Sequence, residues 1–436
     1  MATAPKLSSI RSAKVPRPNH RSLKILIVDE ELPYPLVSGK RIRTMGLLQR
    51  LARRHQITYV CHRNSDEMEA MRAQEYFAAL GIRTLVVDRV VPPKKGPGFY
   101  GRLFLNLFSS LPYSVQSHIS QDMLQTLEEI SKSEEIDLWH CEWSPYAEAV
   151  RHLPGRKLFM AHNVESMIWQ RYHENEKNPL KRWYIGRQVT KFVRFERNVL
   201  KLADMTVAVS ENDACWFQNQ FDINRIDVVD NGVDTEYFQP KDNVREPATL
   251  LFLGSLDWRP NQDGIEEFLR GPYPALQSQN PDIRLLIVGR NPPVSLCQKW
   301  NSLKNVEVHP NVDDVRPFLS RSSALVVPLR IGGGSRLKIL EALACGTPVI
   351  STEVGAEGLR LVDGVHFRSV STIRELVAPI MEYLTHPDKA LCHAKAGCQK
   401  VRQEYDWESL ALRLEDIWFR CVDECGPMLR YMGSYS

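Results

Sequence analysis

A glycine-rich turn in the second half of the chain carries the clearest chemistry. Gly332, Gly333 and Gly334 follow an apolar run that ends at Pro328, and a helical pattern begins near Ser335. Glycines at such a turn let backbone N–H groups approach a phosphate closely, and a helix N-terminus adds about half a positive charge. The turn therefore indicates a phosphate site. A tight turn without a ligand is the alternative.

Charged residues follow the three glycines. Arg336 and Lys338 would add positive charge beside a bound phosphate. Glu341 lies six residues after Ser335, which is about 9 Å along a helix that rises 1.5 Å per residue. That separation suits a diphosphate at the helix tip and a carboxylate that accepts hydrogen bonds from a ribose. A surface glutamate is the alternative.

Two common nucleotide-binding motifs are absent. The GxxxxGK[ST] pattern of P-loops does not occur, because Gly346 is followed by Thr347 and Pro348. No GxGxxG follows the first apolar run, which argues against an NAD-dependent dehydrogenase. Gly39 directly precedes a helical pattern and could contact the same phosphate from the other half of the chain. A simple loop glycine is the alternative.

Short apolar runs alternate with helical patterns, and these elements must position the charged groups. Such runs fit strands that are buried on both faces of a parallel sheet, so the alternation predicts an α/β fold with doubly wound sheets. The first series comprises residues 23–29, 57–62, 83–88, 136–141, 157–163 and 205–210, and the second comprises 226–232, 248–256, 283–289, 306–310, 323–329 and 347–352.

The two series predict two Rossmann-like domains, at 23–222 and 223–404. A polar segment with two prolines, 238–247, separates the two series and is predicted to be a linker. Residues 1–22 are basic and lack the apolar core of a signal peptide, which indicates a flexible tail. Residues 405–436 contain an amphipathic helix, predicted at 406–421 with Asp406 as its N-cap.

Composition and charge exclude several classes of protein. The 436 residues include 56 Lys and Arg against 52 Asp and Glu, and this net charge of +4 is too small to indicate a nucleic-acid partner. The nine cysteines form no CxxC pair, so a zinc or disulfide framework is not expected. No apolar run approaches the roughly 18 residues that span a bilayer. The sequence therefore predicts a cytoplasmic protein.

Seven sequence blocks resemble one enzyme family in their order along the chain. The blocks are PYPLVSGKRIR, HNVES, VDNGVDTEYF, FLGSLDWRPNQDG, LLIVG, HPNVDDVRPFL and GGGSRLKILEALACGTPVIST. Together they resemble the family-4 retaining glycosyltransferases, which have the GT-B fold and use nucleotide-sugar donors. The GGGSRLK block is similar to the branch found among bacterial exopolysaccharide and cell-envelope sugar transferases. The resemblance covers nearly the whole chain after the tail.

This resemblance implies an architecture. The second domain would bind the donor, the first would bind the acceptor, and the active site would lie in the cleft between them. The C-terminal helix would cross back onto the first domain.

The resemblance also assigns roles to individual residues. His162 matches a histidine at a strand end beside the donor sugar and is the predicted catalytic residue, although a histidine in that place is by itself more often structural. Glu341 matches the second of two family glutamates and would hold the ribose hydroxyls. The first glutamate falls on Gly333 and is missing. His140 and Glu165 are weaker candidates for acceptor contacts.

Other donor contacts follow from the same blocks. The family commonly has an arginine and a lysine that bind the diphosphate, and those positions are Ser255 and Pro260 here. Arg259, together with the Arg336 and Lys338 pair, provides candidate substitutes. Val312 lies in the region whose backbone holds the nucleobase in the resembled family.

The sequence contains no D-x-D pair, which metal-dependent glycosyltransferases use to hold a divalent cation. We therefore expect metal-independent transfer and no cofactor. Segment 94–108 mixes basic and apolar residues, and segment 177–201 combines basic residues with aromatic ones, so either could lie on an anionic membrane surface. A solvated helix with a buried apolar face is the alternative.

The predicted function is retaining transfer of a sugar from a nucleotide-sugar donor to a glycan or lipid-linked acceptor in polysaccharide or cell-envelope biosynthesis. Two alternatives remain, a nucleotide-sugar epimerase and a non-catalytic nucleotide-sugar binding protein. Turnover of the donor, and its loss when His162 is changed, would separate an enzyme from a binder.

Overall fold

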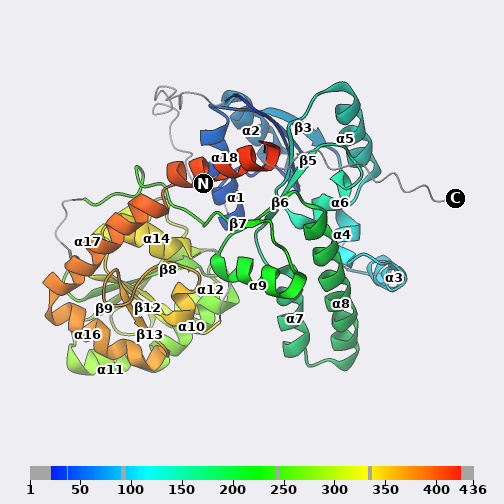
Figure 1. The fold of residues 1–436 in the computed structure, drawn as a ribbon. Helices are drawn as coiled ribbons and strands as arrows, with labels where there is room; N and C mark the ends of the chain where they lie inside the picture. The colour runs from blue at the N-terminus through cyan, green and yellow to red at the C-terminus, as the bar shows by residue number, and fades with distance from the viewer. Residues whose placement is uncertain (1–20, 37, 90–94, 242–244, 332–335, 424–436) are drawn as a thin grey trace. The chain divides into compact units, whose positions relative to one another are not determined.

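The computed structural model describes residues 21–36, 38–89, 95–241, 245–331 and 336–423. The chain forms two compact units (Figure 1). The N-terminal unit contains the described residues up to Asp230 together with those from Ala411 onward, and the C-terminal unit contains Asn231–Leu410.

Each unit is built on one parallel sheet. The N-terminal sheet has seven strands in the order β3-β2-β1-β4-β5-β6-β7, and the C-terminal sheet has six in the order β10-β9-β8-β11-β12-β13. The strands are β1 Lys24–Asp29, β2 Gln56–His62, β3 Arg83–Val87, β4 Leu138–Cys141, β5 Arg156–Ala161, β6 Met205–Ala208, β7 Ile226–Val228, β8 Thr249–Ser255, β9 Arg284–Arg290, β10 Val306–Pro310, β11 Ala324–Val327, β12 Val349–Thr352 and β13 Arg368–Val370.

Helices connect these strands. Those of the N-terminal unit are α1 Gly39–Leu51, α2 Glu67–Ala79, α3 Pro97–Asn106, α4 Tyr113–His118, α5 Gln121–Ser133, α6 Ala147–Val150, α7 Glu165–Asn175, α8 Pro179–Leu202 and α9 Glu211–Phe221. Those of the C-terminal unit are α10 Arg259–Arg270, α11 Pro272–Gln279, α12 Val294–Asn301, α13 Arg316–Arg321, α14 Leu337–Ala344, α15 Glu353–Ala356, α16 Val377–Thr385 and α17 Pro387–Glu404. The last helix, α18 Trp407–Asp423, begins in the C-terminal unit and ends in the N-terminal one.

The apolar strands arise because both faces of each sheet are buried. In β8, Leu250 and Phe252 join one hydrophobic cluster, while Leu251 and Leu253 join another. Successive side chains of a strand point to opposite faces, so a strand between two helical layers needs apolar residues at every position. The two doubly wound parallel sheets confirm the predicted α/β fold class.

Two segments differ from the sequence analysis. The run at 226–228, which was assigned to the second domain, forms β7 and pairs with β6, so that Thr206 lies opposite Ile226 and Ala208 opposite Val228. A short strand can extend either sheet, and its pattern does not tell which one it joins. The polar segment 238–247, which was predicted to be a linker, lies within the C-terminal unit. There Arg245 donates hydrogen bonds to the backbone carbonyls of Leu319, Ser320, Ser322 and Gly346.

Helix α18 belongs to the N-terminal unit through most of its length. Asp406 precedes it and accepts a hydrogen bond from the Glu408 N–H at 2.8 Å, which is a capping contact of the predicted kind. From Ala411 onward the helix buries Leu414, Ile417 and Trp418. A buried face of this kind ties residues 411–423 to the N-terminal unit.

Candidate functional site

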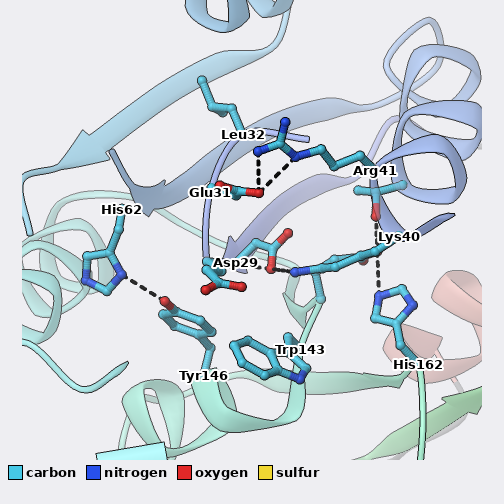
Figure 2. A network of polar contacts seen from close by, with 12 residues as sticks. Asp29, Glu31, Leu32, Lys40, Arg41, His62, Trp143, Tyr146 and His162 are labelled. Carbon is cyan, nitrogen blue, oxygen red and sulfur yellow. Dashed lines mark hydrogen bonds and ion pairs between the residues drawn. The ribbon is translucent and has the colours of Figure 1, made fainter. Parts of the chain in front are cut away.

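Polar side chains gather where three neighbouring strands of the N-terminal sheet end. Asp29 ends β1, Glu142 follows β4 and His162 follows β5, and these strands are adjacent in the sheet. Ligands of open α/β sheets bind outside the carboxyl ends of the strands. This edge is therefore the candidate site of the N-terminal unit (Figure 2).

Asp29 anchors one side of this edge. Its carboxylate is 1% exposed, pairs with the Lys40 ammonium and accepts a hydrogen bond from the Tyr59 hydroxyl at 2.7 Å. Burial disfavours the charge on Lys40, but Asp29 outweighs that effect and raises the pKa of Lys40. The Lys40 ammonium also lies 5.4 Å from the centre of the Trp143 ring. A permanent positive charge is thus held at the first turn of α1 (Figure 2).

His162, the predicted catalytic residue, is fixed by a carboxylate. Its Nε2 lies 3.2 Å from Glu142 Oε1, and its side chain is 9% exposed. Burial lowers the pKa of His162, although the hydrogen bond to Glu142 acts in the opposite direction. The imidazole is therefore neutral at pH 7 and carries its proton on Nε2, because an ionised carboxylate only accepts hydrogen bonds.

The two candidate acceptor residues lie in different surroundings. His140 is 1% exposed and accepts a hydrogen bond from the Trp418 indole at 3.2 Å, so it lies behind Glu142 in the interior. Glu165 is the first residue of α7, and its Oε1 accepts a hydrogen bond from Trp143 Nε1 at 3.3 Å. Burial raises the pKa of Glu165. Of the two, only Glu165 is partly exposed at this edge.

Gly39, the predicted phosphate contact of the N-terminal unit, is the first residue of α1. Ser38 caps this helix and accepts a hydrogen bond from the Arg41 N–H at 3.3 Å. The helix start and the Lys40 ammonium thus place positive charge at the same edge as His162.

Helix α14 carries the charged pair of the C-terminal unit. Lys338 Nζ lies 3.0 Å from Asn261 Oδ1 and 4.7 Å from the centre of the Phe252 ring. Burial, reinforced by Arg336, lowers the pKa of Lys338 to about 7. Burial also raises the pKa of Glu341 to about 7, against the opposing charge of Lys338. Strongly shifted neighbouring groups of this kind are common at functional sites.

A glycine makes room for the Lys338 ammonium. Gly254 lies near the end of β8, and a Cβ atom there would come within 2.7 Å of Lys338 Nζ and 2.9 Å of the Asn261 amide nitrogen. Sequence reasoning missed Asn261 and Gly254. The block FLGSLDWRPNQDG contains both residues, but nothing in their spacing points to Lys338, which lies 77 positions after Asn261.

The other three predicted donor residues that the structure describes are Arg336, Arg259 and Val312. Arg336 is 9% exposed, has a left-handed backbone with φ of 52° and donates a hydrogen bond to the Val354 carbonyl at 2.8 Å. Its guanidinium also lies 3.3 Å from Glu357 Oε2. Arg259 is exposed at the start of α10, and Val312 is a half-buried residue that packs against the core. The predicted phosphate-binding glycines 332–334 lie outside the described residues.

Sequence reasoning missed four residues at the candidate site of the N-terminal unit: Glu142, Thr44, Asp29 and Lys40. Glu142 stands in the block WHCEW directly after β4, and this position at a strand end is a signal that could have identified it.

Within the described ranges, no group of three or more His, Cys, Asp or Glu residues is arranged to hold a metal ion. No helix of the described chain is both long enough and apolar enough to cross a bilayer.

Family comparisons cover both halves of the chain. The family model described as Glycosyltransferase Family 4 matches residues 37–237, and the one described as Glycosyl transferases group 1 matches residues 247–386. A 44.6 kDa uncharacterised protein of the cps region of Klebsiella pneumoniae is 22% identical over 353 residues, which cover 77% of this chain and 84% of that protein.

Solved structures show the same fold at low identity. Sucrose-phosphate synthase from Thermosynechococcus elongatus aligns with a TM-score of 0.66 at 19% identity, over 91% of this chain and 98% of that one. The Anabaena protein HepE in complex with UDP-glucose aligns with a TM-score of 0.61 at 14% identity, over 90% of this chain and 98% of that one. These structures identify the two-sheet architecture as the GT-B fold.

Proposed function

Since the chain belongs to the glycosyltransferases of the GT-B fold, we propose that it transfers a sugar from a nucleotide-sugar donor with retention of anomeric configuration. The acceptor in this proposal is a glycan or a lipid-linked saccharide of a polysaccharide or cell-envelope pathway. The similarity to a protein of a cps region supports that pathway, and UDP-glucose bound to HepE supports the class of donor.

The observation that carries the proposal is the charged pair on α14. Lys338 and Glu341 lie partly buried one turn apart on α14, and burial moves the pKa of each to about 7, as is common at functional sites. Lys338 would neutralise the diphosphate of the donor, and Glu341 would accept hydrogen bonds from the ribose hydroxyls. The start of α14 adds the field of a helix N-terminus.

His162 supplies the contact to the sugar in this proposal. Retaining transfer develops positive charge at the anomeric carbon and negative charge on the leaving phosphate, and fixed dipoles aimed at those charges lower the barrier. A neutral imidazole with Glu142 behind it presents an electron-rich nitrogen to the anomeric centre. The leaving phosphate can accept the proton of the acceptor hydroxyl, so no separate base is needed.

A donor screen followed by product analysis tests this proposal. Nucleotide sugars are compared by thermal shift, because a ligand that binds only the native state raises its stability. The best donor is then incubated with saccharide acceptors, and NMR of the first-formed glycoside reads its anomeric configuration. We expect retention, and about a hundredfold lower turnover for His162→Ala. An inverted product, an epimerised donor without transfer, or near-normal turnover of His162→Ala would contradict the proposal.

A further inference from the structure

A buried carboxylate at the carboxyl edge of the N-terminal sheet connects two histidines. The Glu142 side chain is 3% exposed. Its Oε1 accepts a hydrogen bond from the Thr44 hydroxyl at 2.6 Å and lies 3.2 Å from His162 Nε2. Its Oε2 lies 3.0 Å from His140 Nε2. Three potential donors from α1, β4 and the end of β5 therefore surround one carboxyl group.

Glu142 stays ionised in this environment. Burial would raise the pKa of its carboxyl, but the contacts with His140 and His162 outweigh burial and hold that pKa well below its ordinary value. An ionised carboxylate accepts hydrogen bonds and donates none. His162 therefore donates its Nε2–H to this carboxylate, and His140 presents its Nε2 at 3.0 Å from the other carboxylate oxygen.

The last helix fixes the proton position on the inner histidine. The Trp418 indole can only donate a hydrogen bond, and it donates to His140 Nδ1 at 3.2 Å. Nδ1 of His140 therefore carries no proton, so the neutral ring has its proton on Nε2, toward Glu142. Trp418 is completely buried on α18, and its ring packs edge-on against His140.

These contacts form one connected set that is used below as the histidine network: Trp418, His140, Glu142, Thr44 and His162. It begins on α18, lies beneath the carboxyl edge of the sheet and ends at His162. Nδ1 of His162 has no hydrogen-bond partner among the described residues. Since Nε2 is occupied by Glu142, Nδ1 is the nitrogen that remains for a substrate.

Building on the proposed function, in which His162 contacts the donor sugar, we propose that Glu142 is a positioning residue for His162 and that Trp418 supports Glu142 through His140. The network holds the His162 ring in one orientation and one tautomer, with Nδ1 as an electron-rich acceptor for the sugar. The C-terminal helix thus contributes to turnover through buried side chains that touch no substrate.

Trp418→Phe gives a selective test, because it removes the indole N–H and keeps an aromatic ring in the core. His140 is then free to take the other tautomer, and Glu142 loses one of its donors. We expect turnover to fall about threefold to tenfold while the KM for the donor stays within about twofold.

Trp300→Phe is the matched control in the C-terminal unit. Trp300 is completely buried, and its indole donates to Glu266 at 2.7 Å, so the same change removes an equivalent hydrogen bond. Both variants should lose similar stability, but only Trp418→Phe should lose turnover. Equal turnover of the two variants would overturn the proposal.

A double-mutant cycle tests the partner carboxylate. Glu142→Gln and His162→Ala should each lower turnover, and the double variant should be no slower than His162→Ala alone, because residues that act through one another are not additive. Effects that multiply would show that Glu142 acts independently of His162 and would overturn the proposal.

The ring tautomers can be read without activity. Nitrogen-15 NMR of labelled histidine in the full chain should place the proton on Nε2 of both His140 and His162, and Trp418→Phe should change the signal of His140. A proton on Nδ1 of His162 overturns the positioning role. If both histidines of the wild type carry the proton on Nε2 but no sugar is transferred to any acceptor, the proposed function is contradicted. The positioning of the His162 ring by Glu142 is then still supported.

Discussion

The affinity for the donor should depend on pH through two groups that titrate in the same range. Burial raises the pKa of Glu341 to about 7, and burial together with Arg336 lowers the pKa of Lys338 to about 7. In the proposed function the donor ribose binds the ionised carboxylate, so a proton on Glu341 would compete with the donor. The donor diphosphate would bind the ammonium, so loss of the Lys338 proton would weaken binding. The two dependences have opposite signs.

The size of each dependence follows from the pKa values. A carboxyl with a pKa near 7 is about one-eleventh ionised at pH 6 and about ten-elevenths ionised at pH 8, so Glu341 alone would weaken binding about tenfold, or ~1.4 kcal/mol, between pH 8 and pH 6. Lys338 alone would produce a change of similar size in the other direction. The wild type should therefore bind the donor best near pH 7.

The Glu341→Gln variant should reveal the pH dependence of donor affinity that comes from Lys338 alone. Loss of the charge-assisted hydrogen bonds should weaken donor binding by about 1.5–3 kcal/mol at pH 7. The remaining affinity should then fall as the pH rises, with a midpoint below 7, because Glu341 raises the pKa of Lys338 in the wild type. In the Lys338→Met variant, donor affinity should instead rise with pH. Its midpoint should lie above 7, because Lys338 lowers the pKa of Glu341 in the wild type.

Calorimetric titration of the wild type, Glu341→Gln and Lys338→Met with the donor nucleotide at pH 6, 7 and 8 measures how the affinity of each protein depends on pH. Glu382→Gln is the matched control, because Glu382 is a carboxylate on α16 that pairs with Arg368 and Lys389. It should bind like the wild type at each pH. Glu341→Gln with wild-type affinity and wild-type pH dependence would refute the role of Glu341 at the ribose.

Three further predictions are independent of this titration. Activity should survive EDTA, and a complete loss that Mg²⁺ or Mn²⁺ reverses would show that a metal ion neutralises the diphosphate. Gly254→Ala should displace Lys338 and Asn261, because its Cβ would lie within 2.9 Å of both; we expect about tenfold weaker donor binding with a small change in Tm, and unchanged affinity would argue against this site. Glu196, a carboxyl whose pKa burial raises to about 7, binds a proton more tightly when folded, so stability should fall as the pH rises from about 4.5 to about 7. Chemical denaturation of Glu196→Gln should show a flatter pH dependence, and an unchanged slope would contradict that pKa.

Of the thirteen strands in the described chain, twelve lie within predicted apolar runs or extend no more than one residue beyond them, because burial on both faces makes each run continuous. The missed strand is β13, whose three residues Arg368–Val370 are only half-buried and give no such pattern. The run that forms β7 was recognised, but it was assigned to the second domain instead of the first. Pairing depends on contacts between distant segments, which hydrophobicity along the chain does not report.

The candidate sites were predictable to different degrees. Lys338 and Glu341 could be named because they follow a glycine-rich turn on one helix. Lys40 and Asp29 could not, because they meet only when α1 folds back on the end of β1. His140 was named for a substrate contact, yet it lies in the interior with Trp418 as its partner. A strand-end histidine looks the same in sequence whether its ring faces a ligand or a neighbouring helix.

The position of α18 also determines when the N-terminal unit can be completed during synthesis. Leu414, Ile417 and Trp418 fill its core, and Glu415 contacts His55 at 2.9 Å, yet they are translated only after the whole C-terminal unit. Until then, the nascent N-terminal sheet lacks Trp418, which packs against His140. The unit translated first therefore cannot be completed until the whole C-terminal unit has been translated. A chain that ends at residue 410 would contain every residue of the C-terminal unit but would lack part of the core of the N-terminal unit.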